Sequence, residues 1–144
     1  MPKFSIFILI FIFLLSFLGS FFYSVDAYSL NGDAILLPPS IEHIFGTDRL
    51  GRDIFARVVE GGKVSLTIGV GSAFIASLIG LLLGSIAGYF RGNVDKGFII
   101  LVDLFLTFPT FFLLLALVSY VNASAIVLII IISVTGWMTT ARPI

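Results

Sequence analysis

Charged residues are missing from three long stretches of this sequence. The stretches contain 22 residues (Phe4 to Val25), 27 residues (Val64 to Phe90) and 38 residues (Leu104 to Ala141). The hydrocarbon core of a bilayer is about 30 Å thick, and about 20 apolar residues in a helix cross it. The first two stretches therefore each predict one transmembrane helix.

The third stretch is too long for a single crossing, because a helix of that length would extend over about 57 Å. It contains one polar turn, Asn122-Ala123-Ser124, which divides it in two. After the first helix, the predicted spans cover residues 64–90, 98–120 and 125–141. The sequence thus predicts an all-α membrane protein with about four transmembrane helices.

The composition excludes several functional classes. Charged residues make up 11% of the chain, against about 25% in soluble domains, and the mean hydropathy is +1.19. Eight basic residues are balanced by eight acidic ones with no basic block, so no nucleic-acid partner is expected. The chain has no cysteine and one histidine, which excludes thiolate and histidine-rich metal sites, and it has no Walker-type phosphate loop.

Catalysis within the membrane would need paired acids, or a nucleophile beside a base. Asp103 is the one acidic residue placed where it could take part in such a pair. We therefore expect a chain that is not an enzyme, with no catalytic residue, no cofactor and no metal ion.

Residues 1–25 fit two kinds of segment, an uncleaved membrane anchor or a cleaved signal peptide. The apolar core is longer than the 7 to 15 residues of a signal sequence, and no A-x-A-like cleavage site follows it. We interpret the segment as an N-terminal transmembrane anchor helix and keep the signal peptide as the alternative.

The orientation in the membrane is only weakly indicated by charge. With the N-terminus inside, four basic residues fall on each side, so the positive-inside rule does not decide by number. The inner residues sit in shorter segments, which favours an N-terminus inside. The inner residues are then Lys3, Arg91, Lys96 and Arg142, and the outer ones are Arg49, Arg52, Arg57 and Lys63.

Residues 26–63 form the one water-compatible segment and are predicted to be extracytoplasmic. A helix is expected from Thr47 to Glu60, capped by Thr47 or Asp48, with apolar residues on one face and Gly61-Gly62 ending it. Ion pairs four residues apart would join Asp53 to Arg49 and to Arg57. The charged face of this helix is either simply solvated or a docking surface.

Span two carries a stripe of small residues, which lets two helix backbones approach closely in a membrane. The helix-packing stripe consists of Ser72, Ala76, Gly80, Gly84 and Gly88. We expect this helix to be central, since Gly69, Ala73 and Ser77 add a second, shorter row of small residues.

Span three contains an acidic residue and a proline. Pro109 removes a backbone donor and is expected to kink the helix. Asp103 either faces other helices within the membrane or caps the helix in the headgroup region, and the sequence does not fix its depth.

Three stretches from residue 43 onward form an ordered set of motifs: Gly46 to Asp53, Gly88 to Asp95, and Asp103 with Phe108-Pro109. Together they resemble the C-type permease subunits of dipeptide, oligopeptide and nickel ABC importers. The first stretch resembles the family's G-T-D-x-L-G-R-D signature, and the second resembles its inner turn. Asp103 with Phe108-Pro109 resembles its V-D-x-x-x-x-F-P stretch. The signature residues are Gly46, Thr47, Asp48, Leu50, Gly51, Arg52 and Asp53, and the inner-turn residues are Gly88, Tyr89, Arg91, Gly92 and Asp95.

This resemblance implies a multi-pass protein of the cell inner membrane. Residues 64–144 would form part of a type-1 ABC transmembrane bundle that lines a peptide or nickel pathway. The implied partners are a second permease subunit, two ATPase subunits that hydrolyse ATP, an extracytoplasmic substrate-binding protein and the lipid bilayer.

The family has six spans and a cytoplasmic E-A-A loop after the fourth, where this sequence ends. We therefore expect the chain to correspond to the N-terminal half of a permease, which on its own would not bind an ATPase subunit tightly. The alternative is a truncated or stand-alone four-span membrane protein, with a scaffold or assembly role and no transport activity of its own.

Overall fold

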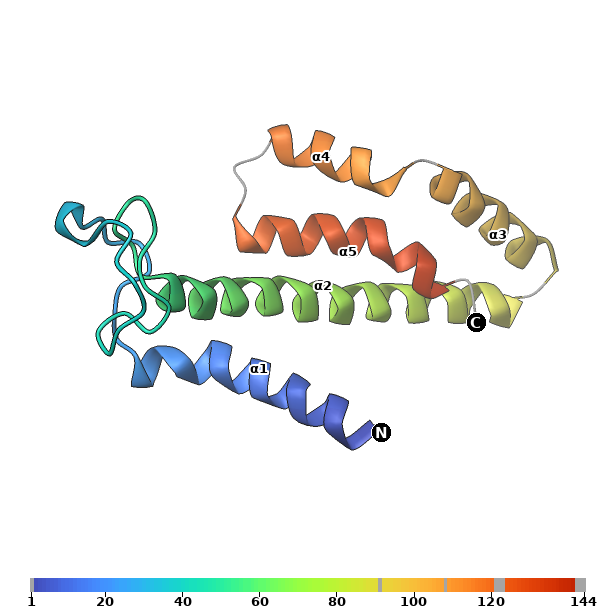
Figure 1. The fold of residues 1–144 in the computed structure, drawn as a ribbon. Coiled ribbons are helices and arrows are strands. Elements are labelled where there is room, and N and C mark those ends of the chain that lie inside the picture. The colour runs from blue at the N-terminus through green and yellow to red at the C-terminus, as the bar shows by residue number, and fades with distance from the viewer. Residues whose placement is uncertain (1, 91, 108, 121–123, 142–144) are drawn as a thin grey trace. The chain divides into compact units, whose positions relative to one another are not determined.

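The computed structural model describes residues 2–90, 92–107, 109–120 and 124–141, and within them every regular element is a helix (Figure 1). Two helices, Lys3–Phe22 and Ile54–Phe90, are long and apolar enough to cross a membrane, and Ala125–Ala141 is a shorter apolar helix. The prediction of an all-α membrane protein is confirmed. The chain divides into two compact units, residues 1–66 and 67–144, which are described separately.

The first unit contains α1 (Pro2–Phe22), a loop with a short 3-10 helix η1 (Gly32–Ala34), and the beginning of α2 (Ile54–Phe90). Helix α1 runs antiparallel to the start of α2. A Cβ added to Gly19 would lie 3.1 Å from a methyl group of Val59, and one added to Gly62 would overlap the hydroxyl of Ser16. Small side chains therefore let these two helices approach closely.

The predicted helix from Thr47 to Glu60 is wrong at both of its ends. Residues 47–53 form turns, and α2 begins at Ile54 with Asp53 as its cap, whose Oδ1 accepts a 2.8 Å hydrogen bond from the Ala56 N–H. The predicted end at Gly61-Gly62 does not exist, because α2 continues without a break to Phe90. A glycine costs a helix about 1 kcal/mol relative to alanine, which does not end a helix held by its neighbours.

The second unit contains the rest of α2, with α3 (Gly92–Thr107), α4 (Thr110–Tyr120) and α5 (Ala125–Ala141). The predicted span 98–120 is thus two helices. The interruption lies at Pro109, where the sequence indicates a kink, and α3 begins earlier than expected, at Gly92. Ser124 caps α5, since its hydroxyl accepts a hydrogen bond of 3.3 Å from the Val127 N–H.

Helices α2 and α5 lie side by side and run in the same direction (Figure 1). A Cβ on Gly71 would lie 3.2 Å from Ile129, and a Cβ on Gly80 would lie 2.9 Å from both the Trp137 carbonyl and the Thr140 side chain. The ring of Trp137 also faces Phe98 of α3, with centroids 6.1 Å apart. Because α2 and α5 are parallel, the chain between them has to return once, and α3 with α4 makes that return.

Four of the five stripe residues on α2 are buried. These are Ser72, Ala76, Gly80 and Gly84. Gly88 is exposed, with nothing within 4 Å of an added Cβ, and Ala87 is buried in its place. A helix turns 100° per residue, so a four-residue repeat drifts by about 160° between positions 72 and 88. Eleven residues bring the helix nearly back to the same face, which puts Ala87 on the face of Ala76.

Candidate functional site

The signature residues 46–53 fold into a closed loop in which the Asp48 side chain binds the loop's own backbone. Asp48 is the centre of this loop. Its Oδ1 accepts hydrogen bonds from the N–H groups of Leu50 (2.8 Å) and Arg52 (3.1 Å), and its Oδ2 accepts one from Arg52 Nε at 2.8 Å. Desolvation raises the pKa of Asp48, but the bonds from Arg52 and Leu50 outweigh it and lower the pKa to about 2. The Asp48 carboxylate therefore stays charged and holds the loop closed.

Thr47 and Gly46 attach this loop to the preceding segment. The Thr47 hydroxyl donates to the Ala34 carbonyl and accepts a 2.8 Å hydrogen bond from the Leu37 N–H. Gly46 has a φ of 73°, and a side chain there would overlap the carbonyl of Leu37. A glycine adopts this left-handed conformation without strain, so the close approach of the two segments depends on it.

Asp53 joins three segments of the first unit, and it is only 2% exposed. Besides capping α2, its carboxylate accepts a hydrogen bond of 2.6 Å from the hydroxyl of Tyr23, which follows α1. The same oxygen, Oδ2, lies 2.9 Å from Nδ1 of His43 in the loop. We call Tyr23, His43 and Asp53 the junction.

Hydrogen bonds keep the buried carboxylate of the junction ionised. Burial raises the pKa of Asp53, but the bonds from the Ala56 N–H, Tyr23 and His43 outweigh it and hold the pKa below its usual value. Burial and the negative Asp53 raise the pKa of Tyr23 to about 12. The expected pairs of Asp53 with Arg49 and Arg57 are wrong, since Tyr23 and His43 occupy the carboxylate. The Arg57 guanidinium instead lies 3.6 Å from Asp48.

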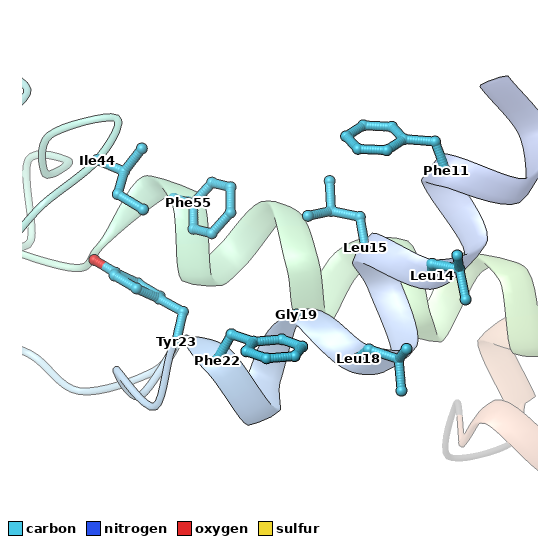
Figure 2. Close-up of a pocket in the computed structure, with 9 residues that line it drawn as sticks. All are labelled: Phe11, Leu14, Leu15, Leu18, Gly19, Phe22, Tyr23, Ile44 and Phe55. Carbon is cyan, nitrogen blue, oxygen red and sulfur yellow. The ribbon is translucent and has the colours of Figure 1, made fainter. Parts of the chain in front are cut away.

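An apolar groove of about 390 Å³ adjoins the junction (Figure 2). Its walls are Leu14, Leu15, Leu18 and Phe22 of α1, with Ile44 and Phe55 opposite. The Tyr23 ring forms the end of the groove and directs its hydroxyl toward the loop that carries Ile44, as Figure 2 shows. The edge of the Tyr23 ring also packs against Phe55, with centroids 5.2 Å apart. The junction thus lies where apolar and polar surroundings meet.

The remaining site residues of the sequence prediction are dispersed. Tyr89 is 83% exposed at the end of α2, Gly92 has a φ of 61°, and Asp95 lies in the first turn of α3. Arg91 lies outside the described residues. The Asp103 side chain is exposed on α3, four residues before the end of that helix. Tyr89, Gly92, Asp95 and Asp103 thus belong to the second unit, and the signature loop belongs to the first.

Sequence reasoning singled out Asp53 but missed Tyr23 and His43 as its partners. Tyr23 is 30 positions away, and nothing in the local pattern connects it with Asp53. His43, the single histidine, lies only three residues before the signature, and that position was the available signal. Among the described residues no group of His, Cys, Asp or Glu is arranged to hold a metal ion.

No protein-family model matches this chain. The chain is 37% identical over 140 residues to the dipeptide transport system permease protein DppC of Bacillus subtilis (strain 168), which is 96% of this chain and 43% of that protein. It is 38% identical over 113 residues to OppC, an oligopeptide transport system permease protein of the same organism (78% of this chain, 36% of that protein). The chain is a relative of dipeptide and oligopeptide permease proteins. The OppC protein of Haemophilus influenzae is 31% identical over 140 residues.

The likeness to DppC extends over nearly the whole chain, so it includes both compact units and the signature loop between α1 and α2. The chain spans less than half the length of each of these three curated relatives. This relationship agrees with the membrane-capable helices of the fold.

Proposed function

We propose that this chain is a permease subunit of an ATP-driven peptide importer and forms part of its transmembrane pathway. The observation that carries the proposal is its 37% identity to a dipeptide permease along 96% of the chain. Matches to oligopeptide permeases at 38% and 31% identity favour peptides over nickel as the transported class. The chain would be a multi-pass protein of the inner membrane and would make or break no covalent bond.

The proposed complex contains a second permease subunit, two ATPase subunits and an extracytoplasmic substrate-binding protein. The helix packing of the second unit is compatible with such a role. Gly80 brings α2 into backbone contact with α5, and a close contact of this kind is how helices associate in lipid without a hydrophobic driving force. A groove of about 310 Å³ lies along the same two helices, and Ser77 and Thr139 are among the residues that line it.

Uptake measurements on cells test this proposal. Deletion of the gene is expected to abolish accumulation of a radiolabelled dipeptide, a longer peptide or both, and restoration of the gene to recover it. Radiolabelled nickel is the matched control and is expected to accumulate equally in both strains. If nickel uptake falls while peptide uptake is unchanged, the transported substrate would be nickel rather than a peptide. Unchanged uptake of every substrate would favour the stand-alone scaffold.

A further inference from the structure

The junction binds the ends of two helices through one carboxylate oxygen. Tyr23 comes directly after α1, Asp53 caps α2, and His43 belongs to the loop between them. The Tyr23 hydroxyl oxygen also lies 2.8 Å from the Glu42 carbonyl, which connects it to the same part of the loop. The His43 contact is therefore one of two links between residues 42–43 and the helix ends, and its loss would leave only the Tyr23–Glu42 contact within the junction.

His43 is the one histidine of the junction. Histidine side chains gain or lose their proton between about pH 5 and 8. The raised pKa of Tyr23 keeps its hydroxyl protonated in that range, and the lowered pKa of Asp53 keeps its carboxylate ionised. Of the charged residues adjacent in sequence to His43 and Asp53, Glu42 has an exposed side chain and Arg52 is bound to Asp48 at 2.8 Å.

We propose that the junction of Tyr23, His43 and Asp53 is a proton-controlled latch that ties residues 41–56 to the adjoining ends of α1 and α2. A protonated imidazole forms a charge-assisted hydrogen bond with a carboxylate, which is stronger than the bond from a neutral ring. The latch is tight at acidic pH and loosens when His43 loses its proton. This proposal does not depend on the transport function proposed above.

Hydrogen–deuterium exchange on the chain in lipid nanodiscs tests the latch. After correction for intrinsic exchange, protection of residues 41–56 is expected to be about two- to fivefold higher at pH 5.5 than at pH 8, the range for an ion pair that solvent reaches on its His43 side. His43→Asn keeps a neutral hydrogen-bond donor without the charge, so its protection is expected to be independent of pH. Equal protection of the native chain at both pH values would overturn the proposal.

A second variant and a measurement without mutation complete the test. Tyr23→Phe removes one hydrogen bond to Asp53 but keeps the His43 pair, so protection is expected to be lower overall with the same pH dependence. The chain has a single histidine, so its ring signals in NMR spectra are unambiguous. The His43 ring and the Ala56 amide are expected to titrate with one midpoint. Different midpoints, or an unaltered pH dependence in His43→Asn, would contradict the latch.

Discussion

Two glycines in the signature loop hold backbone conformations that other residues avoid. Gly46 has a φ of 73° and Gly51 a φ of 72°, and both lie directly against carbonyl groups, those of Leu37 and Asn31. A left-handed conformation costs an L-residue roughly 1–2 kcal/mol, and the overlap with a carbonyl adds to this. The loop around Asp48 therefore depends on the absence of side chains at these two positions.

Gly51→Ala is accordingly expected to destabilise the loop by more than about 1 kcal/mol, the conformational cost alone. Gly32→Ala is the matched control, because an added Cβ there meets nothing within 4 Å. Limited proteolysis of the chain in detergent micelles would measure the effect. We expect faster cleavage within residues 26–53 for Gly51→Ala only. Equal cleavage of both variants would mean that Gly51 does not constrain the loop.

At this scale the sequence indicates which residues matter but not what they do. The resemblance to permeases marks Thr47, Asp48 and Asp53, and all three side chains are hydrogen-bonded in the structure. Their roles were predicted wrongly, because Asp53 rather than Thr47 or Asp48 caps the helix. Thr and Asp both favour the N-cap of a helix, so the local sequence does not show which of these three residues, all within seven positions, is the cap. Their partners elsewhere in the chain distinguish them, since Thr47 binds Ala34 and Leu37 while Asp53 binds Tyr23.

Helix α2 is the element on which both units are built. Its 37 residues would extend about 56 Å, which is longer than the hydrocarbon core of about 30 Å. Its first ten residues contain Arg57, Glu60 and Lys63, so we expect that part to lie outside the hydrocarbon. The sequence pattern misplaced the start of this helix, since Gly61-Gly62 does not break it: Gly62 packs closely against Ser16, and Gly61 faces open space.

The glycines of α2 differ in what surrounds them, and substitution is expected to reveal it. Gly80→Leu would force α2 and α5 apart, because an added Cβ already lies 2.9 Å from the Trp137 carbonyl. Overpacking of this kind costs about 1–3 kcal/mol. Gly88→Leu is the matched control, since it points into open space and improves helix propensity. Thermal unfolding in detergent micelles is expected to show a lower Tm for Gly80→Leu only.

Equal Tm values for the Gly80→Leu and Gly88→Leu proteins would contradict the α2–α5 contact. The small-residue stripe was predictable from its spacing. That its buried part ends at Gly84 was not, because small residues continue to recur every four positions as far as Gly88. The 3.6-residue turn of the helix explains why Gly88 leaves the buried face and Ala87 takes its place.

For the whole molecule, the directions of the helices say more about how the chain crosses the membrane than the number of helices does. The parallel contact of α2 with α5 requires one return of the chain between them, and the interrupted pair α3 and α4 supplies it. If α2 crosses the membrane, α5 then crosses in the same direction. Charge counts alone left the orientation open, since the basic residues divide equally between the two sides.

The most direct test of this membrane arrangement is accessibility labelling of two single-cysteine variants in intact cells. The chain has no cysteine, so Asp33→Cys and Asn93→Cys each introduce one unique thiol. Asp33 lies in the loop between α1 and α2, and Asn93 lies at the start of α3, beyond the far end of α2. A membrane-impermeant maleimide is expected to label the thiol at position 33 and to label that at position 93 only after the cells are opened. Labelling at position 93 but not at position 33 in intact cells would contradict the account.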